Sequence, residues 1–175
     1  MKLKALVASL IAAGGLLGLS AAQASDGTIT FAGSIVATSC AITGGGNILV
    51  NLPPVDAGSL SAVGKTATPT QFSIAMTGCP AATLIHAQFE MGPTVDTATG
   101  NLKVTGGATN VEISLLNPAF QAINIATLAN DGAGTGLTTS AAGAATLTYY
   151  AQYVATAAAT SGTVATTVTY SIVYN

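Results

Sequence analysis

Strict alternation of apolar and polar residues dominates the chain after its first 24 residues. In the clearest run, 164–174, every even position holds Val, Thr, Tyr or Ile. Successive side chains of a strand point to opposite faces, so this pattern predicts a half-buried strand. The same reasoning predicts further strands, at residues 27–37, 48–52, 72–77, 84–91, 111–115 and 147–155.

The predicted strands are separated by turn-forming residues and not by helical segments. Glycine and asparagine cluster at 44–47, 99–101 and 130–132, and residues 132–145 form a Gly/Ala/Thr/Ser stretch that we expect to be a surface loop. Short strands at regular spacing with such turns are typical of an antiparallel β-sandwich. We therefore expect an all-β fold in a single domain, without an internal repeat.

The first 24 residues have the pattern of a signal peptide. Two lysines precede a mostly apolar run at 5–19, and Ala22-Gln23-Ala24 provides a cleavage site, so the mature chain is expected to start at Ser25. The alternative is a transmembrane anchor, which needs about 20 apolar residues. The run is shorter than that, so we predict that residues 1–24 are a signal peptide.

Charged side chains make up only 6% of the residues, against about 25% in an average soluble domain. After residue 24 the only basic side chains are Lys65 and Lys103, against six carboxylates, which gives a formal charge of −4. A nucleic-acid-binding protein needs many basic groups to displace counterions from phosphates. The composition therefore argues against nucleic acid as a partner, and also against most enzymes.

The chain contains two cysteines, Cys40 and Cys79, both in the part expected to be exported. An even pair in an oxidising compartment predicts a disulfide. Closing a loop of about 40 residues would contribute roughly 4 kcal/mol in the chain-entropy model. One histidine and two distant cysteines have no metal-ligand spacing, so we expect no metal site.

Catalytic and nucleotide-binding motifs are incomplete. Gly64-Lys65-Thr66 resembles the end of a phosphate-binding loop, but Ser59 stands where that loop needs its first glycine. His86 and Glu90 would share a strand face about 13 Å apart, too far for a catalytic pair. No G-x-S-x-G elbow occurs. We predict neither an enzyme nor a cofactor, and a hydrolase is the weakest alternative.

The two ends of the chain suggest strand addition between molecules. The strand at 27–37 precedes the first cysteine, and no strand follows the one that ends at Tyr174. A sandwich without its final strand exposes apolar core, which an alternating strand from a neighbour could cover. The alternative is that residues 27–37 fold back on their own domain, since the alternation is the same in both cases.

Several segments together resemble the major subunits of type 1-like fimbriae, which the chaperone–usher pathway assembles. The resemblance covers the whole expected mature chain. Its characteristic features are a penultimate tyrosine, here Tyr174, and a glycine fourteen residues from the C-terminus, here Gly162. The matching segments are 30–36 before Cys40, 72–74 before Cys79, 108–111, and 151–156 through to the end.

The resemblance implies an incomplete immunoglobulin-like β-sandwich lacking its final strand, which a donor strand from a neighbouring subunit completes. It implies that residues 25–38 are an N-terminal extension and 39–175 the pilin domain. It also assigns two sets of residues. The donor face comprises Ile29, Phe31, Gly33 and Ile35. The acceptor groove and chaperone-binding strand comprise Gly162, Val164, Val168, Tyr170, Ile172, Tyr174 and Asn175.

The partners implied are identical or related pilin subunits, a periplasmic chaperone, an outer-membrane usher and a tip adhesin elsewhere in the fibre. The chain would pass through the periplasm to the cell surface and form a fimbrium that supports adhesion. A minor or adaptor pilin of the same system is one alternative. A secreted carbohydrate-binding sandwich is another, although such proteins usually offer aromatic platforms and this chain has no tryptophan.

Overall fold

The computed structural model describes residues 30, 31, 33, 39–133 and 136–175. The chain divides into two units, residues 1–35 and 36–175, and all the regular structure of the described residues belongs to the second. The fold of this unit is all-β, as the alternation predicted. Its strands are β1 (Ala41–Ile42), β2 (Thr70–Thr77), β3 (Leu84–Phe89), β4 (Leu102–Lys103), β5 (Val111–Leu116), β6 (Leu137–Thr138), β7 (Ala145–Ala155) and β8 (Tyr170–Tyr174). Two short 3-10 turns, η1 (Thr43–Gly46) and η2 (Ala57–Leu60), complete it.

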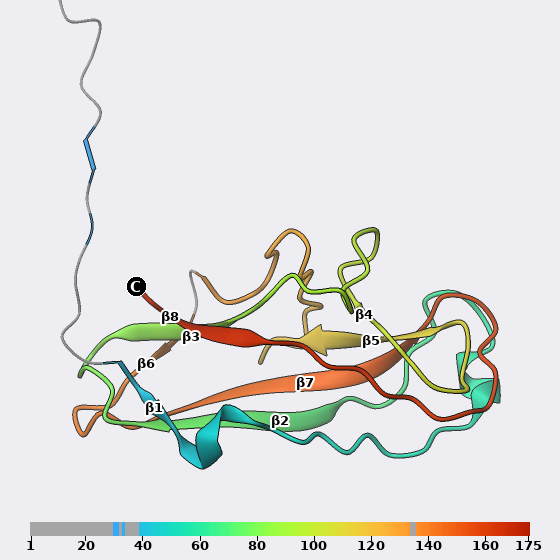
Figure 1. Cartoon of the computed structure of the whole chain (residues 1–175), viewed down its shortest axis with the longest axis horizontal. Coiled ribbons are helices and arrows are strands. Elements are labelled where there is room, and N and C mark those ends of the chain that lie inside the picture. Colours follow the sequence, from blue (N-terminus) through green and yellow to red (C-terminus); the bar gives the residue numbers. More distant parts are fainter. Residues whose placement is uncertain (1–29, 32, 34–38, 134–135) are drawn as a thin grey trace, which may run out of the picture. The chain divides into compact units, whose positions relative to one another are not determined.

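The strands form two antiparallel sheets (Figure 1). One sheet has the order β1-β2-β7-β5-β4, and the other has the order β6-β3-β8. The long strand β7 lies at the centre of the first sheet, where it pairs with β2 on one side and β5 on the other. Among the described strands β8 pairs only with β3, which leaves β8 at the edge of the second sheet.

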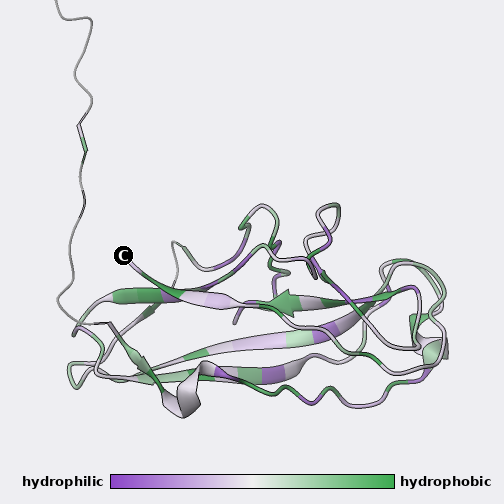
Figure 2. Cartoon of the chain, in the orientation of Figure 1, coloured by the Kyte–Doolittle hydropathy of each residue, from purple (hydrophilic) through white to green (hydrophobic). Residues whose placement is uncertain are grey.

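The core lies between the two sheets. Apolar side chains from β2, β3, β5 and β7 form one buried cluster, and those of β8 pack against it half-buried. Three rings join the layers: Phe89 of β3 contacts Phe72 of β2 and Tyr149 of β7 at centroid distances of 6.4 and 5.2 Å. Figure 2 shows few strongly hydrophilic segments, as expected for a chain with so little charge.

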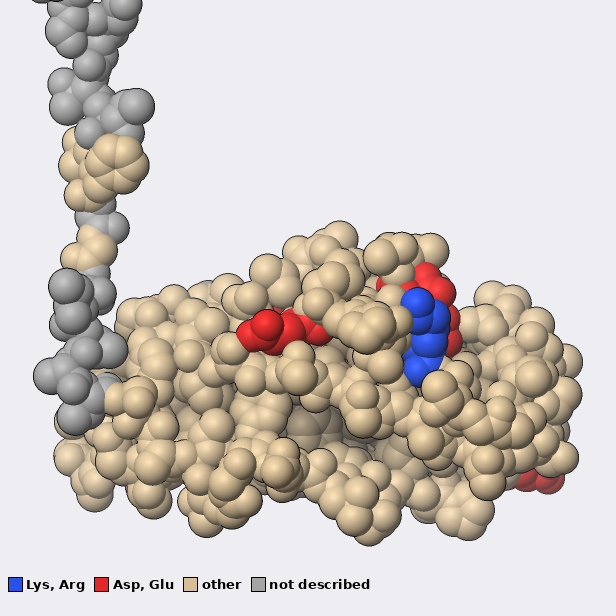
Figure 3. Space-filling model, viewed as in Figure 1, with Lys and Arg blue, Asp and Glu red and all other residues tan. Residues whose placement is uncertain are grey.

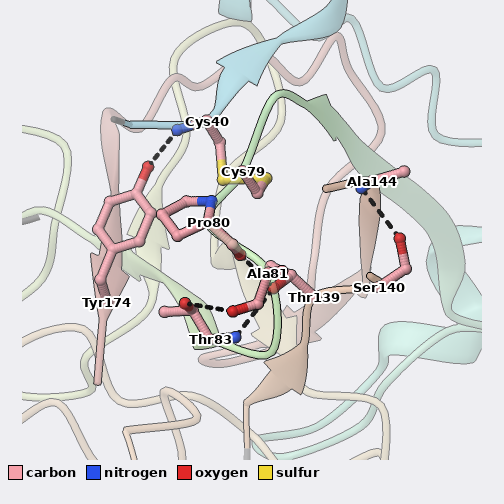
Figure 4. Close-up of a disulfide and its surroundings, with 9 residues drawn as sticks. All are labelled: Cys40, Cys79, Pro80, Ala81, Thr83, Thr139, Ser140, Ala144 and Tyr174. Atoms are coloured by element: carbon pink, nitrogen blue, oxygen red, sulfur yellow. Dashed lines mark hydrogen bonds between the residues drawn. A yellow bond between two sulfur atoms is a disulfide. The ribbon is translucent and has the colours of Figure 1, made fainter. Parts of the chain in front are cut away.

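The predicted disulfide is confirmed: Cys40 and Cys79 are bonded (Figure 4). The bridge ties the start of β1 to the end of β2. Beside it, the Tyr174 hydroxyl accepts a 2.7 Å hydrogen bond from the Cys40 N–H, which links the C-terminal strand to the same point. Two distant parts of the chain are therefore fastened together at this end of the sandwich.

Some predicted boundaries differ from the structure. Residues 48–52 were predicted as a strand but pair with no described strand, and only 170–174 of the predicted strand 164–174 belong to β8. The predicted loop 132–145 includes the short strand β6. Alternation reports which side chains are buried, whereas a strand assignment also requires a hydrogen-bonded neighbour. Within the described residues no helix is long and apolar enough to cross a bilayer.

Candidate strand-binding groove

A groove of about 760 Å³ opens into the core between two segments that do not pair with each other. One wall is the segment 46–52, and the other is the segment 164–170. No charged residue of the described chain lines the groove, and Figure 3 shows this face with a hollow and a few charged side chains around it. The floor consists of core side chains from both sheets, namely Phe72, Ile74, Phe89, Leu102, Ile113, Leu115, Ala151 and Tyr153.

The groove continues into a second hollow of about 500 Å³. The two share Leu52, Tyr153 and Val164, and the second extends past Leu60 to Gly162. From Gly162 to Tyr170 the wall is nine residues long, which corresponds to about 26 Å of extended chain. This length and the apolar floor suit one inserted strand of similar length.

The wall 163–169 has one edge without a backbone partner. Ala165 exchanges both backbone hydrogen bonds with Thr105, at 2.9 and 2.7 Å, and the carbonyls of Thr163 and Thr169 also accept backbone bonds. Backbone groups alternate sides along a strand, so those of residues 164, 166 and 168 point the other way. No other described backbone group bonds to them. Their N–H and C=O groups therefore form an open edge on the groove.

The opposite wall is also without a ladder. Residues 47–55 make no backbone hydrogen bond with any described residue. Several apolar side chains on it are exposed, and Leu49 is 84% exposed. An unpaired edge beside exposed apolar groups is the arrangement that proteins normally cover.

Gly162 is required by a close crossing of backbones. A Cβ at this position would lie well inside 3.0 Å of backbone atoms of Gly107 and Ala108. Hydrogen bonds hold the crossing: Ala108 N–H donates to the Thr163 carbonyl at 3.2 Å, and the Thr109 N–H donates to the Thr160 hydroxyl at 3.0 Å. The glycine thus lets the chain turn into the groove wall.

The titratable groups of the sandwich lie away from the groove floor, except for tyrosines. Burial raises the pKa of Tyr153 and of Tyr170. His86 is buried in β3, with its Nδ1 3.3 Å from the Asn175 side-chain amide. Glu90 bonds instead to the Ser171 hydroxyl. The described residues contain no cluster of three or more His, Cys, Asp or Glu side chains.

The structure brings together part of the predicted acceptor set. Gly162, Val164, Val168 and Tyr170 line the groove. Ile172 and Tyr174 pack against the core farther along β8, and Asn175 follows that strand. Sequence reasoning missed the opposite wall as part of the site. Its only signal was the apolar run 48–52, which looked like an ordinary strand.

The predicted donor residues fall only partly within the described chain. Phe31 is 91% exposed and Gly33 is exposed, with no atom within 4 Å of a Cβ placed on it. Ile29 and Ile35 lie outside the described residues. Their role as a donor strand remains a prediction.

Comparison with known proteins agrees with this arrangement. Residues 29–175 match the family model described as Fimbrial protein. The chain is 42% identical to "Major fimbrial subunit SMF-1" of Stenotrophomonas maltophilia (strain K279a), over 89% of this chain and 96% of the relative. It is also 42% identical to "F17 fimbrial protein" of Escherichia coli, over 89% and 91% of the two chains.

A solved structure supports the fold independently. A chain in the structure of a chaperone–usher pilus superimposes with a TM-score of 0.60 at 20% identity, covering 86% of this chain and 96% of that one. The fold is accordingly the incomplete immunoglobulin-like sandwich of pilus subunits. The chain belongs to the fimbrial protein family.

Proposed function

We propose that this fimbrial subunit polymerises by donor-strand exchange, with the groove as acceptor and residues 25–38 of the next subunit as donor. The observation that carries the proposal is the open backbone edge at residues 164, 166 and 168 beside an apolar floor. An extended segment can supply both the missing hydrogen bonds and the missing side chains. The 42% identity to a major fimbrial subunit favours the role of a main structural component.

The N-terminal extension has the size and pattern that the groove requires. Ile29 to Ile35 spans about 20 Å as a strand, shorter than the groove wall. Its odd positions hold Ile29, Phe31, Gly33 and Ile35, while the even positions are small or polar. Burying one Ile or Phe side chain is worth roughly 1.5–3 kcal/mol, so three give about 5–9 kcal/mol as an upper estimate. This burial favours insertion and offsets part of the cost of ordering the extension.

The route to the fibre would follow from the same incomplete fold. A subunit with an open groove is an aggregation hazard, so a periplasmic chaperone would cover it until an outer-membrane usher exchanges the chaperone for the next subunit. In this scheme the signal peptide at 1–24 directs export, and a tip adhesin lies elsewhere in the fibre. Relatives of the chain are fimbrial proteins, in keeping with a location at the cell surface.

Substitutions on the two faces of the extension test the proposal. Phe31→Ser should block fibre growth, since it removes an apolar anchor from the donor face, while the chaperone-bound subunit stays folded. Thr30→Ser is the matched control on the opposite face and should be nearly silent. Fibre yield by electron microscopy and recovery of the chaperone–subunit complex are the measurements. Normal fibres from Phe31→Ser would contradict donor-strand exchange. Loss of the complex as well would mean that the strand packs on its own domain.

A further inference from the structure

The side chain of Tyr170, on one wall of the groove, is hydrogen-bonded to the opposite wall. Its hydroxyl donates a 2.9 Å hydrogen bond to the carbonyl oxygen of Gly46, 124 residues away in sequence. Both residues line the groove, and Ile172 and Tyr174 farther along β8 do not. The Tyr170–Gly46 bond therefore stands at the point where the groove ends.

The bridge holds the two walls no farther apart than one inserted strand needs. A tyrosine side chain reaches about 6.5 Å from Cα to its hydroxyl oxygen with standard bond lengths. With the 2.9 Å bond, the Gly46 carbonyl lies no more than about 9.4 Å from the Tyr170 Cα. Two strand spacings are about 9.4–9.8 Å. At this point the two walls are therefore no farther apart than one inserted strand requires.

The other ties between the two sides of the molecule lie beyond this point. The Cys40 N–H donates to the Tyr174 hydroxyl, and Cys40 is itself held by the disulfide to Cys79. A tyrosine hydroxyl is protonated and able to donate at neutral pH, and burial raises the pKa of Tyr170 further. Toward Gly162, by contrast, no hydrogen bond joins the described residues of the two walls.

The backbone edge itself does not stop at Tyr170. In the β3–β8 ladder Glu90 donates to Thr169 and Asn175 donates to Leu84, so the odd residues of β8 face β3. The even residues, including Ile172, consequently turn their backbone groups to the same open side as residues 164–168. A strand inserted in the groove could continue along this edge unless something stopped it.

We propose that Tyr170, through its bond to Gly46, is the positioning residue that fixes where an inserted strand ends. The strand pairs with residues 164, 166 and 168 and stops before Ile172. This inference rests on the proposed strand insertion. It assigns to the Tyr170 hydroxyl the role of ending the inserted strand, which packing of the Tyr170 ring in the core would not by itself provide.

Amide hydrogen exchange measured by NMR tests the proposal on the exported chain, 25–175, with and without an excess of a synthetic peptide of residues 26–38. In the wild type, peptide binding should slow exchange about tenfold or more at residues 164, 166 and 168, and leave Ile172 unchanged. In Tyr170→Phe the slowing should extend to Ile172. Tyr153→Phe, which alters a hydroxyl on the groove floor, is the control and should leave the boundary in place.

The outcomes separate the two hypotheses. Slowing at Ile172 already in the wild type, or an unmoved boundary in Tyr170→Phe, would overturn the role of Tyr170 while leaving strand insertion intact. No slowing at residues 164–168 would overturn both. If Tyr170→Phe yields no folded subunit, a wild-type boundary before Ile172 would support the proposal and slowing at Ile172 in the wild type would overturn it. A melting temperature for each variant shows whether a lost boundary reflects general destabilisation.

Discussion

Replacing Gly162 by alanine tests most directly whether the close backbone crossing at the groove wall requires a glycine. The added Cβ would overlap backbone atoms of Gly107 and Ala108, and backbone cannot rotate away as a side chain can. One of the two crossing segments must move. Because residues 164–168 follow directly, the displacement is passed into the open edge that we propose receives the donor strand.

The expected cost follows from the contacts at the crossing. Overpacking by one methyl group typically costs about 1–3 kcal/mol. Moving the segments apart also strains the hydrogen bonds from the N–H groups of Ala108 and Thr109, each worth about 1 kcal/mol net. We expect Gly162→Ala to lose about 2–3 kcal/mol, or about 5–10 °C in Tm for a domain of this size.

Thermal unfolding followed by circular dichroism measures this loss. The subunit should carry a second copy of residues 26–38 fused after Asn175, so that the groove is filled in both variants. Gly92→Ala is the matched control, because the nearest atom to its added Cβ, the Glu90 carbonyl oxygen, lies 4.0 Å away. Equal melting temperatures for the two alanine variants would refute the argument from close backbone contact.

Three further outcomes are expected. The exported protein should begin at Ser25 and carry the Cys40–Cys79 bridge, so its intact mass should rise by about 2 Da on reduction, and a retained leader or free thiols would contradict this. Cys40→Ser should lower stability by roughly 4 kcal/mol in denaturant titration, and unchanged stability would show that the bridge is dispensable. Tyr149→Phe should cost about 1–3 kcal/mol because the buried Ala87 N–H loses its acceptor. Burial raises the pKa of Tyr149, so its contribution is complete below about pH 10 and falls as the pH rises further. The difference in ultraviolet absorbance between wild type and Tyr149→Phe should show this tyrosine ionising at higher pH than free tyrosine, and ionisation at the ordinary pH would be the contrary result.

The sequence by itself determined the all-β class and the buried face of the strictly alternating run at 164–174. Period-two alternation depends only on the geometry of an extended chain, so the even residues of 164–174 were correctly predicted to face the core. The disulfide was equally determined, because two cysteines allow only one pairing. The alternation is a local property of the chain, and the disulfide follows from the number of cysteines alone.

Only the tertiary structure decided which backbone edge lacks a partner. Val164 and Ala165 belong to the same alternating run, but of the two only Ala165 has a backbone hydrogen-bond partner among the described residues, Thr105, which is distant in sequence. For the same reason the run 48–52 looked like an ordinary strand and proved to be a groove wall without a ladder.

The roles of two single residues were likewise hidden in the sequence. Gly162 matched a family pattern, yet the need for glycine arises from a backbone crossing with residues 107–108. Tyr170 followed the alternation as a core residue, and its bond to Gly46 joins parts of the chain 124 residues apart. Side-chain periodicity is set along one strand, whereas contacts of this kind exist only once separate strands have been brought together in space.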